Sequence, residues 1–536
     1  MRDAVAIGLL AIIGLWSTSL KAELSAAPVE LYALDGSVVV KGALLEVSHG
    51  SYVVQTALGT LRIGLDEAQC VGTACPLLDR FDADFSIASS TPDLNEAMSG
   101  ILARYADALE ADYRISEIDA LSSEVSIIES GTSERLASVR IGVRGSDEGT
   151  VSQDDAQSDG SGQNGARGEG LSVFAESNEI ARAGYDDLLT LGLEGVAIIT
   201  HPDSPLAMLS RTELAEVFAC KETASLEVKS LAGPLRVYSR TASSDTYQAF
   251  KATVLDPLNL GLCDQVIQLP SDSDIAAAVA RDVNAIGAIN LRHQHEAKPL
   301  AIAECGLVHQ PYLFGAKTEE YPLTRRILLD APLLTDSSAA AQTFIDFTLG
   351  DIGQRHLETV GLIGLDPMST SAYASRYRVS RIEAAAGAVQ NTEIFGRLLV
   401  ALEDAVRLSV TFRFSTGGAS VDGQTGLDNR AQRDLIRLAD YLRTTAPDGT
   451  EVLLFGFADA AGDYDGNLSL SLQRARSVAD KLESLGVKPS FVAGFGEEGP
   501  VACNSDANGR AKNRRVEVWL RLPDASNDQR MINITM

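Results

Sequence analysis

The sequence predicts an α/β protein with a small N-terminal β-rich module, a middle α/β domain and a compact C-terminal α/β sandwich. A chain of 536 residues is too long for one hydrophobic core, so several domains are expected. Short alternating apolar segments dominate up to about residue 80, and strand and helix patterns alternate after it. We predict these boundaries: signal peptide 1–22, β-rich module 27–80, binding domain 82–375, helical connector 376–406, sandwich 407–522 and polar tail 523–536.

The N-terminus has the pattern of a secretory signal. Arg2 is followed by an uncharged apolar run from Ala4 to Trp16, which is too short to span a bilayer as a helix. We place cleavage after Ala22, although Leu20 is larger than the residue usual at its position, and a retained anchor is the alternative. The sequence therefore predicts export to the periplasm, with no membrane span in the mature protein.

Charge and cysteine content narrow the partners further. The formal net charge is −28, which repels nucleic acids and anionic lipid headgroups. Six cysteines in an exported chain favour disulfides over metal sites, and Cys70 and Cys75 are close enough in CVGTAC to pair. Three cysteines in the middle region suggest one without a partner there, and Cys503 is isolated in the last domain; the pairing stays open.

The N-terminal module reads as a hairpin meander. Val29 and Leu31 alternate with polar positions before an Asp35-Gly36 turn, and strands follow at Val38–Val47 and Tyr52–Thr56.

The middle region alternates strands and helices. Phe85–Ala88 reads as a strand that leads through Ser89-Ser90-Thr91-Pro92 into a helix ending near Glu110. Residues 146–170 are rich in Gly, Ser, Asp and Gln, as in a surface loop. Later strands are expected at Gly195–Thr200, Leu235–Ser239 and Ala285–Asn290, with a helix at Leu209–Phe218. This order predicts mainly parallel strands.

Several short motifs suggest a ligand for the middle region. The RTASSDT segment after a strand, the SST junction and AIGAIN resemble the PstS-like periplasmic phosphate-binding family over Asp82–Gly364. That resemblance implies a two-lobed fold binding phosphate or a related oxyanion. Such a ligand needs hydroxyl and N–H donors and an arginine, and the candidates are Ser90, Thr91, Arg240, Ser243, Ser244, Asp245 and Thr246.

One position departs from that family. Asp245 stands where the family pattern Ser-Gly-Thr has glycine, and its carboxylate would either accept from a protonated phosphate or exclude anions. The alternative is a binding fold that serves as a spacer or protein-docking module.

The C-terminal region reads as β-α-β-α-β. Leu408 and Val410 begin an alternating strand, a second strand covers Val452–Phe457, and the last contains Val516 and Val518. Apolar residues at helical spacing separate these strands.

The motifs of this region resemble the OmpA-like peptidoglycan-binding family over Arg407–Leu522. They are GFAD at 456–459, Gly462, Asn467, LS at 470–471, RA at 474–475 and NRRVE at 513–517. In that family an Asp and an Arg hold the diaminopimelate of the peptide stem, and these positions fall on Asp459 and Arg474, with Asn467 bracing the loop. Ala458 departs from the family by replacing the usual Thr.

The chemistry agrees with this resemblance. Diaminopimelate carries an ammonium and a carboxylate on one carbon, so Asp459 can accept from the former and Arg474 can clamp the latter. We expect Arg474 in the first turn of a helix, and Arg514 and Arg515 as structural ties of the last strand. The alternative is a simple surface pair between Asp459 and Arg474.

The sequence contains no GxSxG, HExxH or GxxxxGK[ST] motif, and His293 with His295 and Glu296 reads as an exposed connection. We therefore predict no enzyme and no cofactor. The expected protein is periplasmic, associated with the cell wall and outer membrane, and binds peptidoglycan and a small oxyanion.

Overall fold

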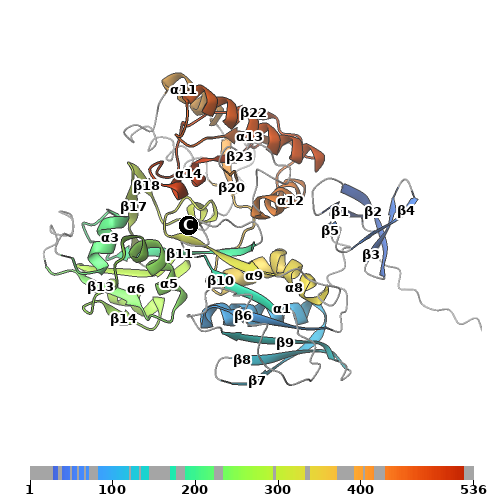
Figure 1. The fold of residues 1–536 in the computed structure, drawn as a ribbon, viewed down its shortest axis with the longest axis horizontal. Helices are drawn as coiled ribbons and strands as arrows, with labels where there is room; N and C mark the ends of the chain where they lie inside the picture. The colour runs from blue at the N-terminus through green and yellow to red at the C-terminus, as the bar shows by residue number, and fades with distance from the viewer. Residues whose placement is uncertain are drawn as a thin grey trace, which may run out of the picture. The chain divides into compact units, whose positions relative to one another are not determined.

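The structure is a computed structural model, and it divides into two compact units (Figure 1). One unit contains residues 1–34 and 39–76, and the other contains residues 35–38 and 77–536. The described residues are 28–33, 39–48, 51–56, 59–64, 68–71, 83–119, 122–131, 135–143, 170–176, 188–221, 233–293, 297–331, 339–370, 391–402, 405–415 and 429–523. The predicted signal peptide 1–22, Cys75, most of the 146–170 loop and the tail after Pro523 lie outside them.

The N-terminal unit is an antiparallel sheet in the order β4-β3-β2-β1-β5. Alternating apolar side chains, among them Val29, Leu31 and Val54, form its core, so the predicted meander is confirmed. Cys70 lies in β5 and is disulfide-bonded. The strands are β1 Pro28–Ala33, β2 Val39–Ser48, β3 Ser51–Thr56, β4 Gly59–Gly64 and β5 Ala68–Val71.

The first lobe of the middle domain has its own core. Helix α1 lays Met98, Ile101 and Leu102 against the sheet, where they are almost fully buried with Phe344 of α8. Its elements are β6 Ala83–Ser89, α1 Pro92–Ala108, β7 Ala111–Glu117, β8 Ser122–Glu129, β9 Arg135–Val143, β10 Gly170–Ala175, α8 Ala339–Leu349 and α9 Asp351–Thr359.

The second lobe has a separate core around Phe218, Phe250 and Ile289. Its sheet strands are β13 Arg236–Arg240, β14 Ile267–Leu269, β15 Ala285–Asn290 and β16 Lys298–Pro299. A smaller sheet contains β12 Met208–Ser210, β17 Ala301–Glu304 and β18 Leu307–His309. The helices are α3 Arg211–Phe218, α5 Asp245–Phe250, α6 Asp272–Val279 and α7 Leu313–Lys317, and a π-helical turn at Lys251–Leu255 continues α5.

Two long strands join the lobes. β11 (Leu188–Thr200) pairs with β19 (Thr324–Asp330) in its first half and with β15 in its second half. Leu191 packs in the first core and Ile198 in the second, so the predicted two-lobed α/β fold is confirmed (Figure 1). The expectation of mainly parallel strands was wrong, because β11 runs antiparallel to both partners and β7, β8 and β9 form an antiparallel meander.

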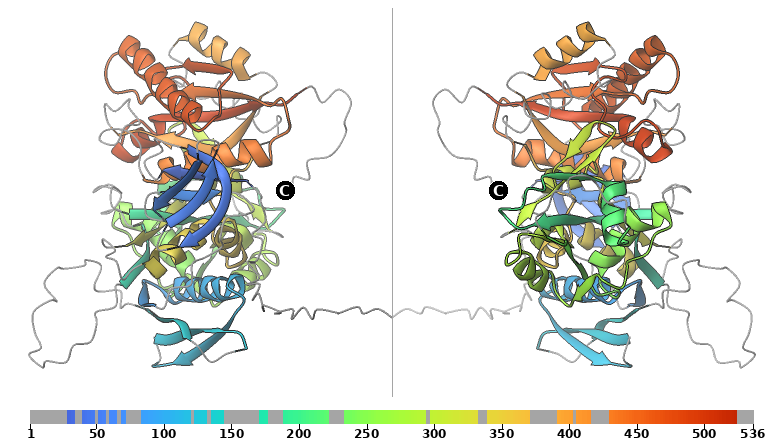
Figure 2. Two further views of the ribbon diagram at one scale, coloured as in Figure 1. Left: turned by 90° about the vertical axis from the view of Figure 1, so that its right-hand side faces the viewer. Right: turned by 90° about the vertical axis from the view of Figure 1, so that its left-hand side faces the viewer.

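The C-terminal domain is a sandwich on a sheet in the order β20-β23-β21-β22. Helix α13 packs on β21 and β22 (Figure 2). Helix α11 contributes Phe395 to the core that contains Phe455 and Trp519. Its elements are α11 Thr392–Leu402, β20 Ala405–Arg413, α12 Asn429–Thr444, β21 Glu451–Gly456, α13 Tyr464–Ser484, β22 Phe491–Gly494, α14 Ala507–Asn513 and β23 Arg515–Arg521. Within the described ranges, no helix combines the length and apolar character needed to cross a bilayer.

Two disulfides correct the cysteine reading. Cys220 pairs with Cys263 inside the second lobe, and Cys305 pairs with Cys503 across 198 residues of sequence. Cys503 is therefore not isolated, and the odd cysteine of the middle region finds its partner in the C-terminal domain. Sequence counting by domain missed this because it did not consider bonds between domains.

Candidate functional site

The candidate wall-binding site forms where α13 crosses the end of β21. Gly456 ends β21, and a Cβ atom there would lie 1.9 Å from the carbonyl oxygen of Ser471. Only glycine allows this approach, because any side chain would push the helix away. Asp459, three residues beyond the strand, interacts electrostatically with Arg474 on the helix.

An ion pair and a backbone hydrogen bond fix the position of the Asp459 carboxylate. Its side chain is largely buried, and its Oδ2 lies 2.8 Å from Nη1 of Arg514. Its Oδ1 accepts a hydrogen bond of 3.0 Å from the backbone N–H of Ala461. The carboxylate thus keeps a fixed direction while one of its neighbours is a permanent cation.

Arg474 lies against an aromatic ring and is fully buried. Its guanidinium is centred 5.5 Å from the ring of Phe414, and its Nη1 lies 3.4 Å from the carbonyl oxygen of Phe457. Burial and the nearby Arg514 lower the pKa of Arg474 to about 10, so it remains a cation at neutral pH. A ligand carboxylate can reach this group only if the side chains covering it move aside.

The expected helix position of Arg474 was wrong. Helix α13 begins at Tyr464 and is capped by Asp463, whose carboxylate accepts from Gly466 N–H, so Arg474 sits in the middle of the helix. The free backbone N–H groups of the first turn of α13 therefore do not contribute to anion binding at Arg474. The error arose because the segment around Asn467 was interpreted as a loop, whereas it forms the first turns of α13.

Asn467 lies in the N-terminal part of α13 and is buried, with its backbone N–H donating to Asp463 O. Among the described residues its Nδ2 has no hydrogen-bond acceptor. A buried amide donor of this kind ordinarily binds water or a ligand. Its predicted role as a loop brace stays a prediction.

The two arginines of NRRVE differ in role. Arg515 is structural: it pairs with Glu517 at 2.7 Å and donates to Gly499 O. Arg514 has a second role, which the sequence reading missed, because it holds Asp459 and also donates from Nε to Phe414 O at 2.9 Å. The structure therefore pairs Asp459 with Arg514, instead of the simple pair with Arg474 considered as an alternative.

The residues predicted to bind an oxyanion mostly have other partners. Thr91 and Ser244 cap α1 and α5 by accepting from Leu94 N–H and Tyr247 N–H. Arg240 lies 3.0 Å from Asp272 through its Nη1. Ser243 is exposed, Ser90 is half-buried, and Asp245 and Thr246 are buried in α5.

Carboxylates gather at the interlobe contact, which joins α1 to α5. Asp245 N–H donates to Oδ2 of Asp93 at 3.1 Å, and the Asp245 carboxyl is hydrogen-bonded to Thr91. Beside them Glu194 of β11 lies 2.7 Å from Arg325 of β19, and Arg325 also donates to Asp245 O. The sequence reading missed Asp93, Glu194 and Arg325, although a single Glu within the apolar run of β11 was a usable signal.

We predict that Asp245 makes stability depend on pH. Burial raises the pKa of its carboxyl from 3.8 to about 6. Between these values the folded state keeps a proton that the unfolded state releases, so stability falls as pH rises through the window, by on the order of 2–3 kcal/mol. Asp245→Asn should therefore gain stability relative to the wild type from pH 4 to pH 6.5 in urea unfolding. The exposed Asp480→Asn is the control, and a pH-independent difference for Asp245→Asn would refute the assignment.

Comparisons with known proteins follow the same division of the chain. Over the middle region, the ABC-type phosphate transport receptor from Vibrio cholerae is a structural neighbour, with 16% identity and a TM-score of 0.35, covering 52% of this chain and 99% of that one.

The C-terminal region has relatives in sequence. The probable lipoprotein YiaD of Escherichia coli is 47% identical over 73 residues, 13% of this chain and 33% of YiaD. The peptidoglycan-binding protein ArfA of Mycobacterium tuberculosis is 34% identical over 168 residues, 30% of this chain and 51% of ArfA. The chain thus spans one third of the length of YiaD and about half of the length of ArfA. Residues 421–514 match the OmpA family model, so the chain carries an OmpA-like domain at its C-terminus.

Proposed function

We propose that this chain is a cell-envelope protein tethered to the wall by its C-terminal domain, which binds diaminopimelate in peptidoglycan. The observation that carries the proposal is the electrostatic interaction between Asp459 and Arg474, which lie on the two segments joined by the close Gly456–Ser471 contact. The match to the OmpA family and the similarity to a peptidoglycan-binding protein support it.

The two side chains suit the two ends of a zwitterion. Asp459 offers an oriented carboxylate to the ligand ammonium, and its ion pair with Arg514 fixes the direction of that carboxylate. Arg474 offers a guanidinium, supported by Phe414, to the ligand carboxylate. A lysine within a stem peptide, whose ε-carbon bears an ammonium but no carboxylate, would satisfy only half of the site.

Sedimentation of the full chain with purified sacculi tests this function. We expect saturable binding to intact sacculi and no binding after an amidase has removed the stem peptides. Binding that survives amidase treatment would contradict recognition of the stem and would point to the glycan.

For the middle domain, the geometry favours a docking or spacer role over oxyanion capture. Arg240 pairs with Asp272, and Asp93 and Asp245 supply negative charge at the interlobe contact. An incoming anion would be repelled by these groups, and it would have to displace Asp93 from Asp245 N–H.

We predict that phosphate gives no saturable heat when titrated into the full chain at pH 7.5. Sulfate should behave in the same way. The double variant Asp93→Ser with Asp245→Gly removes two negative charges from this contact. In the same titration we expect this variant to bind phosphate weakly. Saturable heat with the wild-type protein would contradict the docking role and support an oxyanion receptor.

A further inference from the structure

A buried glutamate of the middle domain lies at the junction with the C-terminal domain. Glu319 follows α7 in a left-handed conformation with φ of 55°, and 14% of its side chain is exposed. Its carboxylate lies 3.1 Å from Arg326 of β19 and pairs with Arg430 of α12 and Arg413 of β20. Although burial alone would raise it, these guanidinium groups hold the pKa of Glu319 far below its ordinary value.

Arg413 connects this cluster to the candidate wall-binding site. It lies 3.8 Å from Glu319, and it donates to the backbone oxygens of Thr318 and, at 3.0 Å, Lys512. The ring of the next residue, Phe414, lies against Arg474, and its carbonyl oxygen accepts a hydrogen bond from Arg514. Arg514 in turn holds Asp459. One continuous set of contacts therefore runs from Glu319 to both residues that would hold the ligand.

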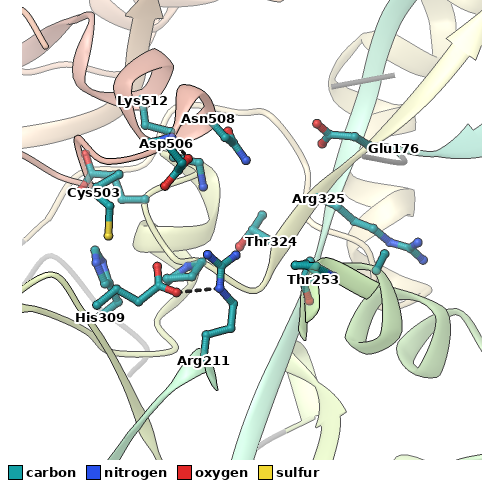
Figure 3. A pocket seen from close by; sticks show the side chains of 17 residues that line it. Glu176, Arg211, Thr253, His309, Thr324, Arg325, Cys503, Asp506, Asn508 and Lys512 are labelled. Atoms are coloured by element: carbon teal, nitrogen blue, oxygen red, sulfur yellow. Dashed lines mark hydrogen bonds and ion pairs between the residues drawn. The ribbon is translucent and has the colours of Figure 1, made fainter. Parts of the chain in front are cut away.

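Other contacts fix the same junction. The Cys305–Cys503 disulfide links the β17–β18 turn to the C-terminal domain, and Leu307 of β18 packs in that domain's core. Arg407 of β20 pairs with Glu320 at 2.6 Å. A cavity of about 90 Å³ is lined from both sides, with Arg211 and His309 facing Lys512, Asp506 and Asn508 (Figure 3).

We propose that Glu319 is a positioning residue of the wall-binding site, so that the site is complete only when the middle domain is docked. The inference rests on the proposed function of Asp459 and Arg474. Glu319 balances three arginines, and without its charge Arg413 and Arg430 would repel each other and leave their positions. A displaced Arg413 would carry Phe414 with it, which removes the support of Arg474 and the acceptor for Arg514.

The test is sacculus affinity of the full chain with Glu319→Gln. We expect roughly tenfold weaker binding, partial recovery with Glu319→Asp, and no change with the exposed Glu483→Gln. The second measurement is a double-mutant cycle with Arg514→Gln. If Glu319 acts through Phe414 and Arg514, its substitution should cost little more in the Arg514→Gln background.

Unchanged affinity in Glu319→Gln, or losses that simply add in the cycle, would overturn the proposal. If Glu319→Gln folds poorly by thermal melting, Arg413→Lys replaces it, because lysine keeps the charge but cannot hold Thr318, Lys512 and Glu319 together. Full affinity in that variant would likewise overturn it. Failure of the proposed function itself would be recognised separately, as unchanged binding in Asp459→Ala.

Discussion

Asp459→Ala should release the protein from purified sacculi, with an affinity at least tenfold and up to a hundredfold lower than that of the wild type. A hydrogen bond to a charged group contributes roughly 1.5–3 kcal/mol, and its loss leaves the ligand ammonium without its partner. The substitution also frees Arg514, which lies 2.8 Å from Asp459, to repel that ammonium. Pelleting with sacculi over a range of protein concentrations measures the change.

The controls separate recognition from folding and bulk charge. Asp480→Asn removes one negative charge from the exposed face of the same helix and should bind normally. Arg474→Lys keeps the cation but loses the forked geometry, so its affinity should fall between those of the wild type and Asp459→Ala. Retention of wild-type binding by both Asp459→Ala and Arg474→Lys would exclude these residues from the site.

Arg325→Met should destabilise the middle domain by about 3–5 kcal/mol, because it leaves Glu194 buried without its counter-charge. Glu194 is 1% exposed, and the two side chains lie 2.7 Å apart. Arg325 also donates to Asp245 O, so its loss removes a contact between β19 and α5. The thermal transition of this domain should fall by about 10 °C.

The double variant Arg325→Met with Glu194→Leu is the matched control. Replacing both members of a buried pair by apolar side chains removes the uncompensated charge, so much of the lost stability should return. If Arg325→Met melts within 1–2 °C of the wild type, the stability of the middle domain does not depend on the Glu194–Arg325 pair.

Local patterns predicted much of this fold and pointed to Asp459 and Arg474 as candidate site residues. The alternation in β20, the apolar run of β15 and the motif blocks around Asp459 and Arg474 are encoded by neighbours in sequence, so they could be read directly. The start of α13 was misjudged because the segment around Asn467 was interpreted as a loop, whereas Asp463 caps the helix ahead of it.

Partners that are distant in sequence could not be predicted in this way. Asp93 and Asp245 are 152 residues apart, and Glu194 and Arg325 are 131 apart, yet these pairs set the charge of the interlobe contact. The same limit hid Arg514 beside Asp459 and the Cys305–Cys503 bond. Periodicity reports which face of an element is buried but not which distant side chain meets it there.

Covalent and ionic contacts join the middle domain to the C-terminal domain. Cys305–Cys503, Arg407–Glu320 and the Glu319 cluster hold the middle and C-terminal domains in one compact unit. Under the proposed function, a partner docked on the middle domain would be held near the wall, and its local concentration there would rise.

Titration of free meso-diaminopimelate into the full chain by calorimetry tests the central claim most directly. We predict saturable heat for the wild type, none for Asp459→Ala, and none for Nα-acetyl-lysine amide, whose ammonium has no carboxylate on the same carbon, at the same concentrations. Equal heats for diaminopimelate and this lysine derivative, or saturable binding that persists in Asp459→Ala, would contradict recognition of a zwitterion by Asp459 and Arg474.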